Sequence, residues 1–298
     1  MNLNDYLKQA KEGRYAIGHF NFATEDVLKA IVSAAKESGA PCVMVGTSEG
    51  EADFVGLKEA VAMVRAAADD FQYPVFLNAD HFKSFEKAKA AIDGGYDSII
   101  IDASRLNLEE NIALTKQVTD YARLVNQNIS VEGELGYLKG SSEVQTKIEI
   151  SSADYSKPEE VAYFVSQTGV DRMAVVFGNI HGIVTDQEEK LDIEHLAKII
   201  SYVKRGAPSQ VAKVPLVEPY YVLHGASGLK DEDVAASIKA GIVNVHFNTE
   251  LRVVYRNEID KQFHAHPNET TPYKYLGPAA EEVKKLVAQK IKLFMSSR

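Results

Sequence analysis

Three histidines and one aspartate stand where apolar runs of the sequence end. Asp80 and His81 follow VFLNA. His181 follows AVVFGNI, and His224 follows YYVL. Neutral imidazoles that converge from separate strands suit a catalytic Zn²⁺, which takes three protein ligands and keeps one position open. A single histidine at a strand end is more often a hydrogen-bonded structural residue, but three together, two of them beside glycine, favour a metal site.

The elements that must position these residues alternate between strand and helix patterns. Eight runs rich in Val, Ile and Phe read as buried strands, at 15–22, 41–46, 74–81, 98–103, 129–135, 172–182, 220–228 and 241–250. Seven segments between them have apolar residues at three- and four-residue spacing, at 26–38, 57–70, 84–93, 108–125, 158–168, 191–204 and 231–240. This order predicts an α/β fold with a parallel sheet covered by helices.

Eight strand-helix units favour a closed (β/α)8 TIM barrel, with a C-terminal helical extension, over an open doubly wound sheet. The open sheet is the alternative, but the dinucleotide fingerprint GxGxxG is absent after the first strand, which continues as GHFNFAT. The active face of such a barrel lies at the carboxyl ends of its strands. The four residues above all belong to that face.

Small residues that leave backbone N–H groups exposed also occur on this face. They are Gly182 and the run Gly225, Ala226 and Ser227. The last apolar run ends at Asn248 and Thr249, where a helix is expected to begin. Barrel enzymes often bind phosphate through such amides and a helix N-terminus near their last two strands. The pattern is typical of an anion site, although GASG alone is also typical of a tight turn.

Length and composition narrow the class of protein. The 298 residues are 45% hydrophobic and have no Pro/Ser-rich linker, so one domain covering 1–298 is expected. A net charge of -9 argues against a nucleic-acid partner. The single Cys42 excludes an intramolecular disulfide, and no apolar run has the length of a membrane span. These features predict a cytoplasmic protein with no membrane partner.

Six motifs of the chain resemble, in order and spacing, those of the class II zinc-dependent ketose-bisphosphate aldolases, which include fructose-1,6-bisphosphate and tagatose-1,6-bisphosphate aldolases. The motifs are FNF, NADH, VEGELGYLKG, VVFGNIHG, VLHGASG and GIVNVHFNTE. GNIHG together with LHGASG is the most specific part of the resemblance, which covers nearly the whole chain. It implies a (β/α)8 barrel and a lyase that cleaves a phosphorylated ketose to dihydroxyacetone phosphate and an aldehyde.

The resemblance implies that His81, His181 and His224 hold the catalytic zinc and that Asp80 is the acid/base at the C4 hydroxyl of the substrate. Chemistry supports these roles independently. Cleavage of the C3–C4 bond leaves a carbanion beside a carbonyl, and a Lewis acid on the carbonyl and C3 oxygens can spread that charge as an enediolate. No lysine Schiff base is then required. Asp80 needs only hydrogen-bond reach of the C4 hydroxyl.

Further residues are implied around this centre. Asp102 and Glu134 stand at the ends of the fourth and fifth strands, where such carboxylates lie close to the metal or its alternate position, and anchoring hydrogen bonds is their alternative role. Asn21 matches an asparagine that contacts substrate. The phosphate on C1 is expected at Gly182, the GASG loop and Thr249.

The long segment 136–157 is rich in Ser, Gly and charge, which favours a mobile lid that excludes water; an inert insertion is the alternative. The resemblance implies a glutamate here that moves the proton at C3. Counting from Glu134 gives Ser142, and Glu143, one residue later, is the candidate.

Two positions depart from the family's pattern in a related way. His246 stands where a substrate-binding Asn is usual, and His19 stands where a small residue is usual. The first and last strands of a closed barrel are neighbours, and residues two apart face the same side, so His19 lies beneath Asn21 on the inward face. We expect the two imidazoles to meet by hydrogen bond near the carbonyl end of the substrate, with independent drift as the alternative.

A further departure precedes the seventh strand. The stretch KVPLVEPYYVLHG offers two candidate strands, at 213–217 and 220–223, where the family has one. An insertion over 211–221 or an altered wall or subunit contact at Tyr220 and Tyr221 would explain it.

The sequence therefore predicts zinc as cofactor, a small phosphorylated sugar as ligand, and a homodimer or homotetramer. A monovalent cation is an open addition. Fructose 1,6-bisphosphate is the default substrate and tagatose 1,6-bisphosphate the alternative. A zinc hydrolase with Asp80 as base on a metal-bound water, or a non-catalytic sugar-phosphate sensor, are alternatives from other classes.

Overall fold

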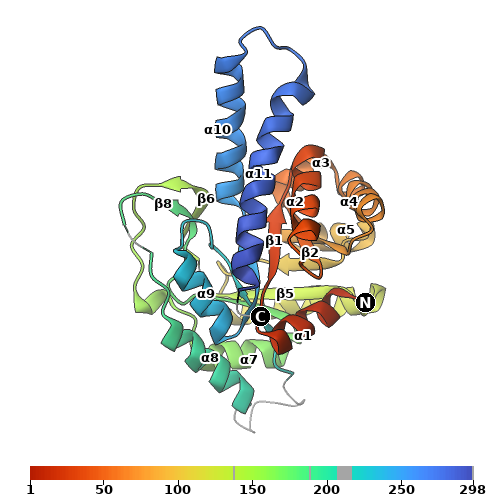
Figure 1. Ribbon diagram of the computed structural model, residues 1–298. Coiled ribbons are helices and arrows are strands. Elements are labelled where there is room, and N and C mark those ends of the chain that lie inside the picture. The colour runs from red at the N-terminus through yellow and green to blue at the C-terminus, as the bar shows by residue number, and fades with distance from the viewer. Residues whose placement is uncertain (137, 188, 207–216, 297–298) are drawn as a thin grey trace.

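Eight parallel strands close into a barrel in the computed structural model, which describes residues 1–136, 138–187, 189–206 and 217–296 (Figure 1). Around the barrel the strands follow the order β1-β10-β9-β7-β5-β4-β3-β2. Their bounds are β1 Ile17–Asn21, β2 Val43–Ser48, β3 Val75–Phe82, β4 Ser98–Ile101, β5 Ser130–Leu135, β7 Arg172–Val175, β9 Tyr220–Leu223 and β10 Ile242–Phe247. Each coincides with one of the predicted runs, so the closed barrel is confirmed and the open sheet is excluded.

One predicted run divides in the structure. The barrel strand β7 ends at Val175, and His181 begins a separate strand, β8 His181–Val184. β8 pairs in parallel with β6 Gly140–Gln145 in a two-stranded sheet outside the barrel. The expectation that His181 ends a barrel strand is therefore wrong. Part of the segment expected to be a lid forms strand β6.

Helices cover the barrel between successive strands. Their bounds are α1 Leu3–Gly13, α2 Glu25–Glu37, α3 Glu49–Val55, α4 Leu57–Phe71, α5 Phe85–Gly94, α6 Leu108–Val125, α7 Pro158–Thr168, α8 Ile193–Arg205, α9 Asp231–Ala240, α10 Thr249–Ala265 and α11 Pro272–Phe294, with a 3-10 turn η1 at Ser152–Asp154. Local signals start several of them, because Ser84, Asn107 and Asp192 each accept a hydrogen bond from a backbone N–H of the first turn. All seven predicted helices are present.

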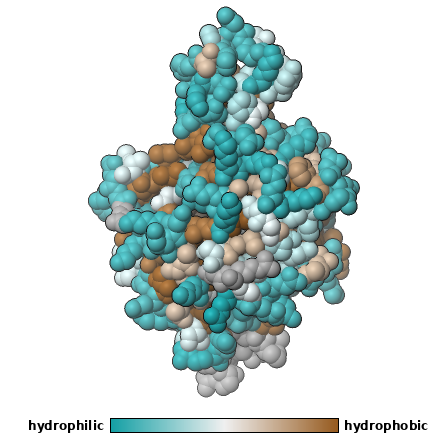
Figure 2. All heavy atoms as spheres, in the orientation of Figure 1, coloured by the Kyte–Doolittle hydropathy of each residue, from teal (hydrophilic) through white to brown (hydrophobic). Residues whose placement is uncertain are grey.

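The C-terminal extension consists of α10 and α11. The inner part of α11 packs against α2 and β1, where Val283, Val287 and Phe294 are buried. Figure 1 shows α10 and the outer part of α11 projecting together beyond the barrel, and Figure 2 shows this projection largely covered by hydrophilic residues. None of the described helices is both long and apolar enough to cross a membrane.

The interior of the barrel has an apolar end and a polar centre. Leu3 and Leu7 of α1 pack with Ile17, Met44 and Val243 and close the end where the strands begin. Many of the other side chains buried among the barrel strands are polar. They are His19, Asn78, Ser98, Ser130, Glu132, Arg172, His224, Asn244 and His246. Because buried polar groups need hydrogen-bond partners, this centre must be organised as a network.

Of the two candidate strands at 213–217 and 220–223, the structure describes the second in full. β9 begins at Tyr220, and Tyr221 is buried in the main core. Most of the first expected strand, at 213–217, lies outside the described residues.

Candidate active site

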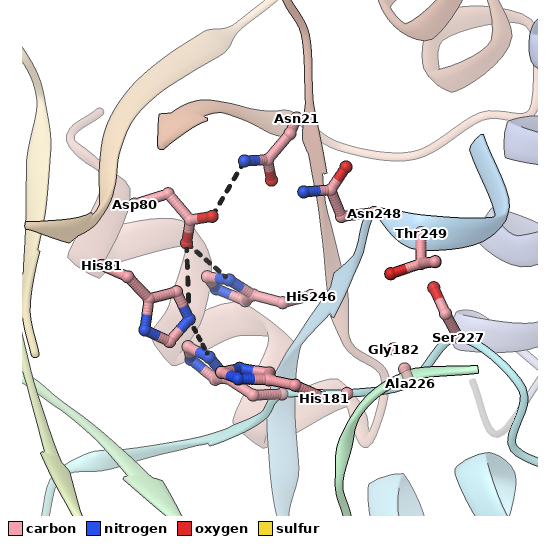
Figure 3. A pocket seen from close by; sticks show the side chains of 12 residues that line it. Asn21, Asp80, His81, His181, Gly182, Ala226, Ser227, His246, Asn248 and Thr249 are labelled. Atoms are coloured by element: carbon pink, nitrogen blue, oxygen red, sulfur yellow. Dashed lines mark hydrogen bonds and ion pairs between the residues drawn. The ribbon is translucent and has the colours of Figure 1, made fainter. Parts of the chain in front are cut away.

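A cavity of about 30 Å³ opens where the barrel strands end. It is lined by Asn21, Asp80, His81, His181, Gly182, His224, Gly225, Ala226, Ser227, His246, Asn248 and Thr249. All twelve are residues that the sequence marks as candidates, and Figure 3 shows them converging from separate elements. The structure thus brings the expected metal, acid/base and phosphate residues to one place.

The three histidines form a compact cluster. One ring nitrogen of each of His81, His181 and His224 lies within 4.8 Å of the others. Nε2 of His81 and Nδ1 of His224 are 2.8 Å apart. His81 has a left-handed backbone with φ of 53°, an uncommon conformation for a residue other than glycine, and such strain is concentrated at functional sites.

The surroundings of two rings determine where their protons lie. Nε2 of His224 is 2.6 Å from Oε1 of Glu132, so it carries hydrogen and leaves the lone pair on Nδ1. Nδ1 of His81 is 3.3 Å from Asp102 and 3.2 Å from Glu134, so it too carries hydrogen and leaves Nε2 to face His224. Two lone pairs 2.8 Å apart repel unless a proton or a metal ion lies between them. The donor set therefore fits a metal such as zinc, with Glu132, Asp102 and Glu134 orienting its ligands.

The pKa values of the cluster agree with this assignment. Burial lowers the pKa of His81, but Asp80, Glu134 and Asp102 outweigh it and raise the pKa well above the usual value. Burial lowers the pKa of His181 to about 3, so this ring stays neutral and can offer a lone pair. Without a metal, a second proton on His81 takes the place of the cation.

Asp80 is held as a carboxylate beside the cluster. Its Oδ2 accepts a hydrogen bond of 2.8 Å from the amide of Asn21, which also donates to Glu51. Burial raises the pKa of Asp80, but His81, His19 and His224 lower it to about 2 overall. Both amide hydrogens of Asn21 are thus engaged, and a substrate would meet its carbonyl oxygen.

The expected phosphate residues surround one end of the cavity. A Cβ on Gly225 would lie 1.9 Å from the carbonyl oxygen of Ile180, so only glycine fits this close approach. The backbone N–H of Gly228 donates to Glu250, and the N–H of Glu250 donates to the hydroxyl of Ser227. These bonds join the GASG loop to the start of α10, whose N-terminus favours an anion.

The polar centre of the barrel reaches the site through Arg172, which is fully buried. Its guanidinium donates to Asn244, to Asn78 and Ser98, and to Ser130, and its Nη1 lies 2.7 Å from Glu132. Three of these partners each contact one imidazole. Asn78 contacts His19, Asn244 contacts His246, and Glu132 contacts His224.

The expected contact between His19 and His246 exists in a different form. The two residues are paired across β1 and β10, and their rings stack with centroids 3.8 Å apart. His246 also stacks on His224, with centroids 4.3 Å apart. The expected hydrogen bond between His19 and His246 is wrong, because a nitrogen of each ring bonds to an asparagine instead.

A larger cavity of about 340 Å³ adjoins the first and shares Asp80, His81, His181 and Asn248 with it. Asp102 and Glu134 line this second cavity, together with Lys83, Arg105 and Arg252. Glu143 lies on β6 with an exposed side chain that accepts a hydrogen bond of 3.4 Å from Ser141, and it lines neither cavity.

Glu132 and Arg172 are the main residues that the sequence analysis missed. Glu132 precedes Glu134 by two positions, so both face the barrel interior, and this period-two spacing is a signal that identifies it. Arg172 is a charged residue at the start of a buried apolar strand, which is a second usable signal.

Glu132→Gln should weaken metal binding about 10- to 100-fold, because the carboxylate that orients the metal-facing ring is lost. Titration of the metal-free protein with Zn²⁺ against a competing chelator measures this. The matched control is Glu149→Gln, whose side chain is 86% exposed and pairs with Lys147. An unchanged affinity in folded Glu132→Gln protein would contradict the orienting role.

Metal affinity should rise about tenfold for each pH unit through neutral pH, because the raised pKa of His81 means that one proton must leave before the metal binds. Above the pKa the affinity should become constant. The same titration at a series of pH values tests this, and Glu134→Gln should move the rise to lower pH. Affinity that does not vary across neutral pH would be inconsistent with a protonated His81.

Comparisons with known proteins agree with this geometry. The chain is 34% identical over 300 residues to fructose-bisphosphate aldolase from Geobacillus stearothermophilus, covering 100% of this chain and 97% of that protein. Of solved structures, the YdjI aldolase from Escherichia coli K12 has a TM-score of 0.79 and 27% identity, over 98% of this chain and 96% of that one. Fructose-bisphosphate aldolase from Campylobacter jejuni, at 21% identity over 99% of this chain and 93% of that one, supports the fold alone with a TM-score of 0.74.

The sequence model of class II fructose-bisphosphate aldolases matches residues 1–298. Enzymes of this family are generally metal dependent, which agrees with the candidate ligand clusters described above. The chain therefore belongs to the class II fructose-bisphosphate aldolase family and is an aldolase, a lyase.

Proposed function

We propose that the protein is a zinc-dependent aldolase that reversibly cleaves a ketose 1,6-bisphosphate, with fructose 1,6-bisphosphate as the default substrate. The products are dihydroxyacetone phosphate and glyceraldehyde 3-phosphate. The observation that carries the proposal is the pair of ring nitrogens, of His81 and His224, 2.8 Å apart beside the Asp80 carboxylate, in a cavity that is also lined by Gly182 and the GASG loop. This arrangement joins a cation site, a base and an anion site.

His81, His181 and His224 would hold the zinc. When bound, Zn²⁺ supplies a Lewis acid that stabilises the negative charge developing on the C2 and C3 oxygens of the ketose. Asp102 and Glu134 would fix the orientation of His81, as Glu132 fixes His224. A monovalent cation is an open addition.

Asp80 would take the proton of the C4 hydroxyl during cleavage and return it during condensation. Its lowered pKa of about 2 keeps it ionised, so the form that can accept a proton is the one present at neutral pH. General base catalysis of this kind contributes about 10²- to 10⁴-fold in rate. Asn21 holds the other carboxylate oxygen, so the acceptor stays aimed into the cavity.

The C1 phosphate would bind at Gly182, Gly225, Ala226 and Ser227 and at the start of α10, where Asn248 and Thr249 stand. Backbone N–H groups and the helix N-terminus provide positive potential there. The ligand would pass His246 and extend into the adjoining cavity of about 340 Å³, where Lys83, Arg105 and Arg252 offer positive charge for a distal anionic group.

The C3 proton requires a carrier, for which Glu143 remains the candidate. Its exposed side chain would need β6 to move toward the cavity, in keeping with a lid that closes after binding. A homodimer or homotetramer remains the expected assembly. Membership of the aldolase family favours this lyase over a zinc hydrolase or a sensor.

Purified protein should release triose phosphate from fructose 1,6-bisphosphate, lose this activity with a chelator and regain it with Zn²⁺. Tagatose 1,6-bisphosphate measured alongside determines which C4 configuration is preferred. Asp80→Asn should lower kcat about 10²- to 10⁴-fold while metal binding persists. Zinc-loaded protein that cleaves neither sugar would refute the assignment to these substrates.

A further inference from the structure

Several buried polar atoms around the cavity have no hydrogen-bond partner in the part of the chain that the structure describes. Besides Nδ1 of His81 and Oδ1 of Asn248, they include Oδ1 of Asp80 and Nδ1 of His19, which lie on one side of the cavity. Nδ1 of His246 lies 3.6 Å from the same Asp80 oxygen, too far for a hydrogen bond. Because buried polar atoms are rarely left unsatisfied, this combination calls for an occupant.

The proton on His246 can be assigned from its neighbours. Nδ2 of Asn244 donates to the carbonyl oxygen of Ile17, which fixes the orientation of the amide. Its Oδ1 accepts from Arg172 and lies 3.1 Å from Nε2 of His246. An amide oxygen only accepts, so Nε2 carries the hydrogen, and the neutral ring presents a lone pair at Nδ1.

The same argument gives the opposite result for His19. Oδ1 of Asn78 accepts from Ser98 and from Arg172, so Nδ2 of Asn78 is the atom that faces His19, at 3.1 Å. An NH₂ group donates, so Nε2 of His19 accepts and its hydrogen lies on Nδ1. The unpartnered Nδ1 of His19 is therefore a donor.

The three groups together define what they can bind. Asp80 Oδ1 and His246 Nδ1, 3.6 Å apart, are acceptors, and His19 Nδ1 is a donor. The three residues cluster, because a carboxylate oxygen of Asp80 and one ring nitrogen of each histidine lie within 4.8 Å of one another. Water donates two hydrogen bonds and accepts others, so it satisfies all three groups at once. A sugar hydroxyl can satisfy one acceptor and the donor. A metal ion fits less well, because the hydrogen on His19 points where a ligand lone pair would be needed.

We propose that Asp80, His246 and His19 form a hydroxyl pocket, filled by one water in the free protein and by the C3 hydroxyl of the ketose in the complex. The identity of the sugar hydroxyl rests on the proposed function. His246 stacks on the metal-facing His224 and precedes the phosphate residue Asn248 by two positions, so the dihydroxyacetone half of the ligand lies over it. The C3 hydroxyl is also adjacent to the C4 hydroxyl that Asp80 would deprotonate.

This pocket would determine whether the residue at position 246 binds a hydrogen-bond acceptor or a hydrogen-bond donor of the substrate. An asparagine there can turn its NH₂ group toward a carbonyl or phosphate oxygen. The lone pair of His246 instead repels such oxygens and attracts a hydroxyl. His246 would act as a substrate-contacting residue that selects for the hydroxyl, and His19 would complete the pocket from below.

A crystal structure of the free wild-type protein tests the water directly. We expect one ordered oxygen within hydrogen-bond distance of Asp80 Oδ1, His246 Nδ1 and His19 Nδ1, and its loss in His246→Phe and in His19→Phe, which keep the ring stack but remove the nitrogens. No ordered oxygen there, while other buried waters are visible, would overturn the proposal. An oxygen that contacts only one of the three groups would also overturn it.

Ligand binding separates the sugar hydroxyl from water. Calorimetry compares dihydroxyacetone phosphate with hydroxyacetone phosphate, which lacks the hydroxyl. His246→Phe should reduce the wild-type preference for the hydroxyl about 2- to 10-fold, since one buried neutral hydrogen bond is lost. His264→Phe, at a histidine whose side chain is 79% exposed, is the matched control and should keep the preference.

An unchanged preference in His246→Phe would refute the hydroxyl contact even if the water is present. Neither measurement requires turnover. The hydroxyl pocket can therefore be refuted in a protein that cleaves fructose 1,6-bisphosphate. Equally, the pocket can be observed in a protein that does not cleave this sugar.

Discussion

The guanidinium of Arg172, fully buried at the centre of the barrel, is the group on which the order of the site depends. A buried charge is costly unless it is paired and its hydrogens are bonded. Here four hydrogen bonds and an ion pair of 2.7 Å with Glu132 use the five N–H donors of the side chain. The partners come from β3, β4, β5 and β10, so one side chain fixes the mutual orientation of strands around the barrel.

The same partners carry this order to the chemistry. Glu132 sets the proton of His224, Asn244 sets that of His246, and Asn78 sets that of His19. The three rings stack above one another with interplanar angles of 15° for each neighbouring pair. Two rings therefore present lone pairs to the site and the third presents a hydrogen. The three histidines therefore differ in role because their neighbours differ. His224 offers a metal ligand, His246 accepts a hydrogen bond from a hydroxyl, and His19 donates one.

Features that depend on local patterns were predictable from the sequence. Strand ends, glycine turns and the helix start at Asn248 are read from neighbouring residues, and the barrel then brings them to one face. The position of His181 was not, because β8 forms only by pairing with β6, and such long-range pairing leaves no local signal. Counting along a loop indicates Glu143, but in the structure its exposed side chain lies on β6 and lines neither cavity.

The network around Arg172 was missed for a related reason, since it depends on which residues face one another across the strands. Glu132 is opposite Arg172, and Asn78 is opposite Ser98. The nearness of His19 and His246 was predictable because the first and last strands must meet, and the register pairs them directly. The stacking of the two rings was not predictable, because it depends on Asn78 and Asn244, which bind the ring nitrogens.

The positions of the imidazole protons test this account most directly. The ¹⁵N NMR spectrum of protein labelled in its histidine rings distinguishes the two tautomers, and His→Phe variants assign the signals. The account predicts neutral His224 and His246 with hydrogen on Nε2, and neutral His19 with hydrogen on Nδ1. Hydrogen on Nδ1 of His246, or on Nε2 of His19, would contradict it, because the network around Arg172 would then not determine what the rings present to the site.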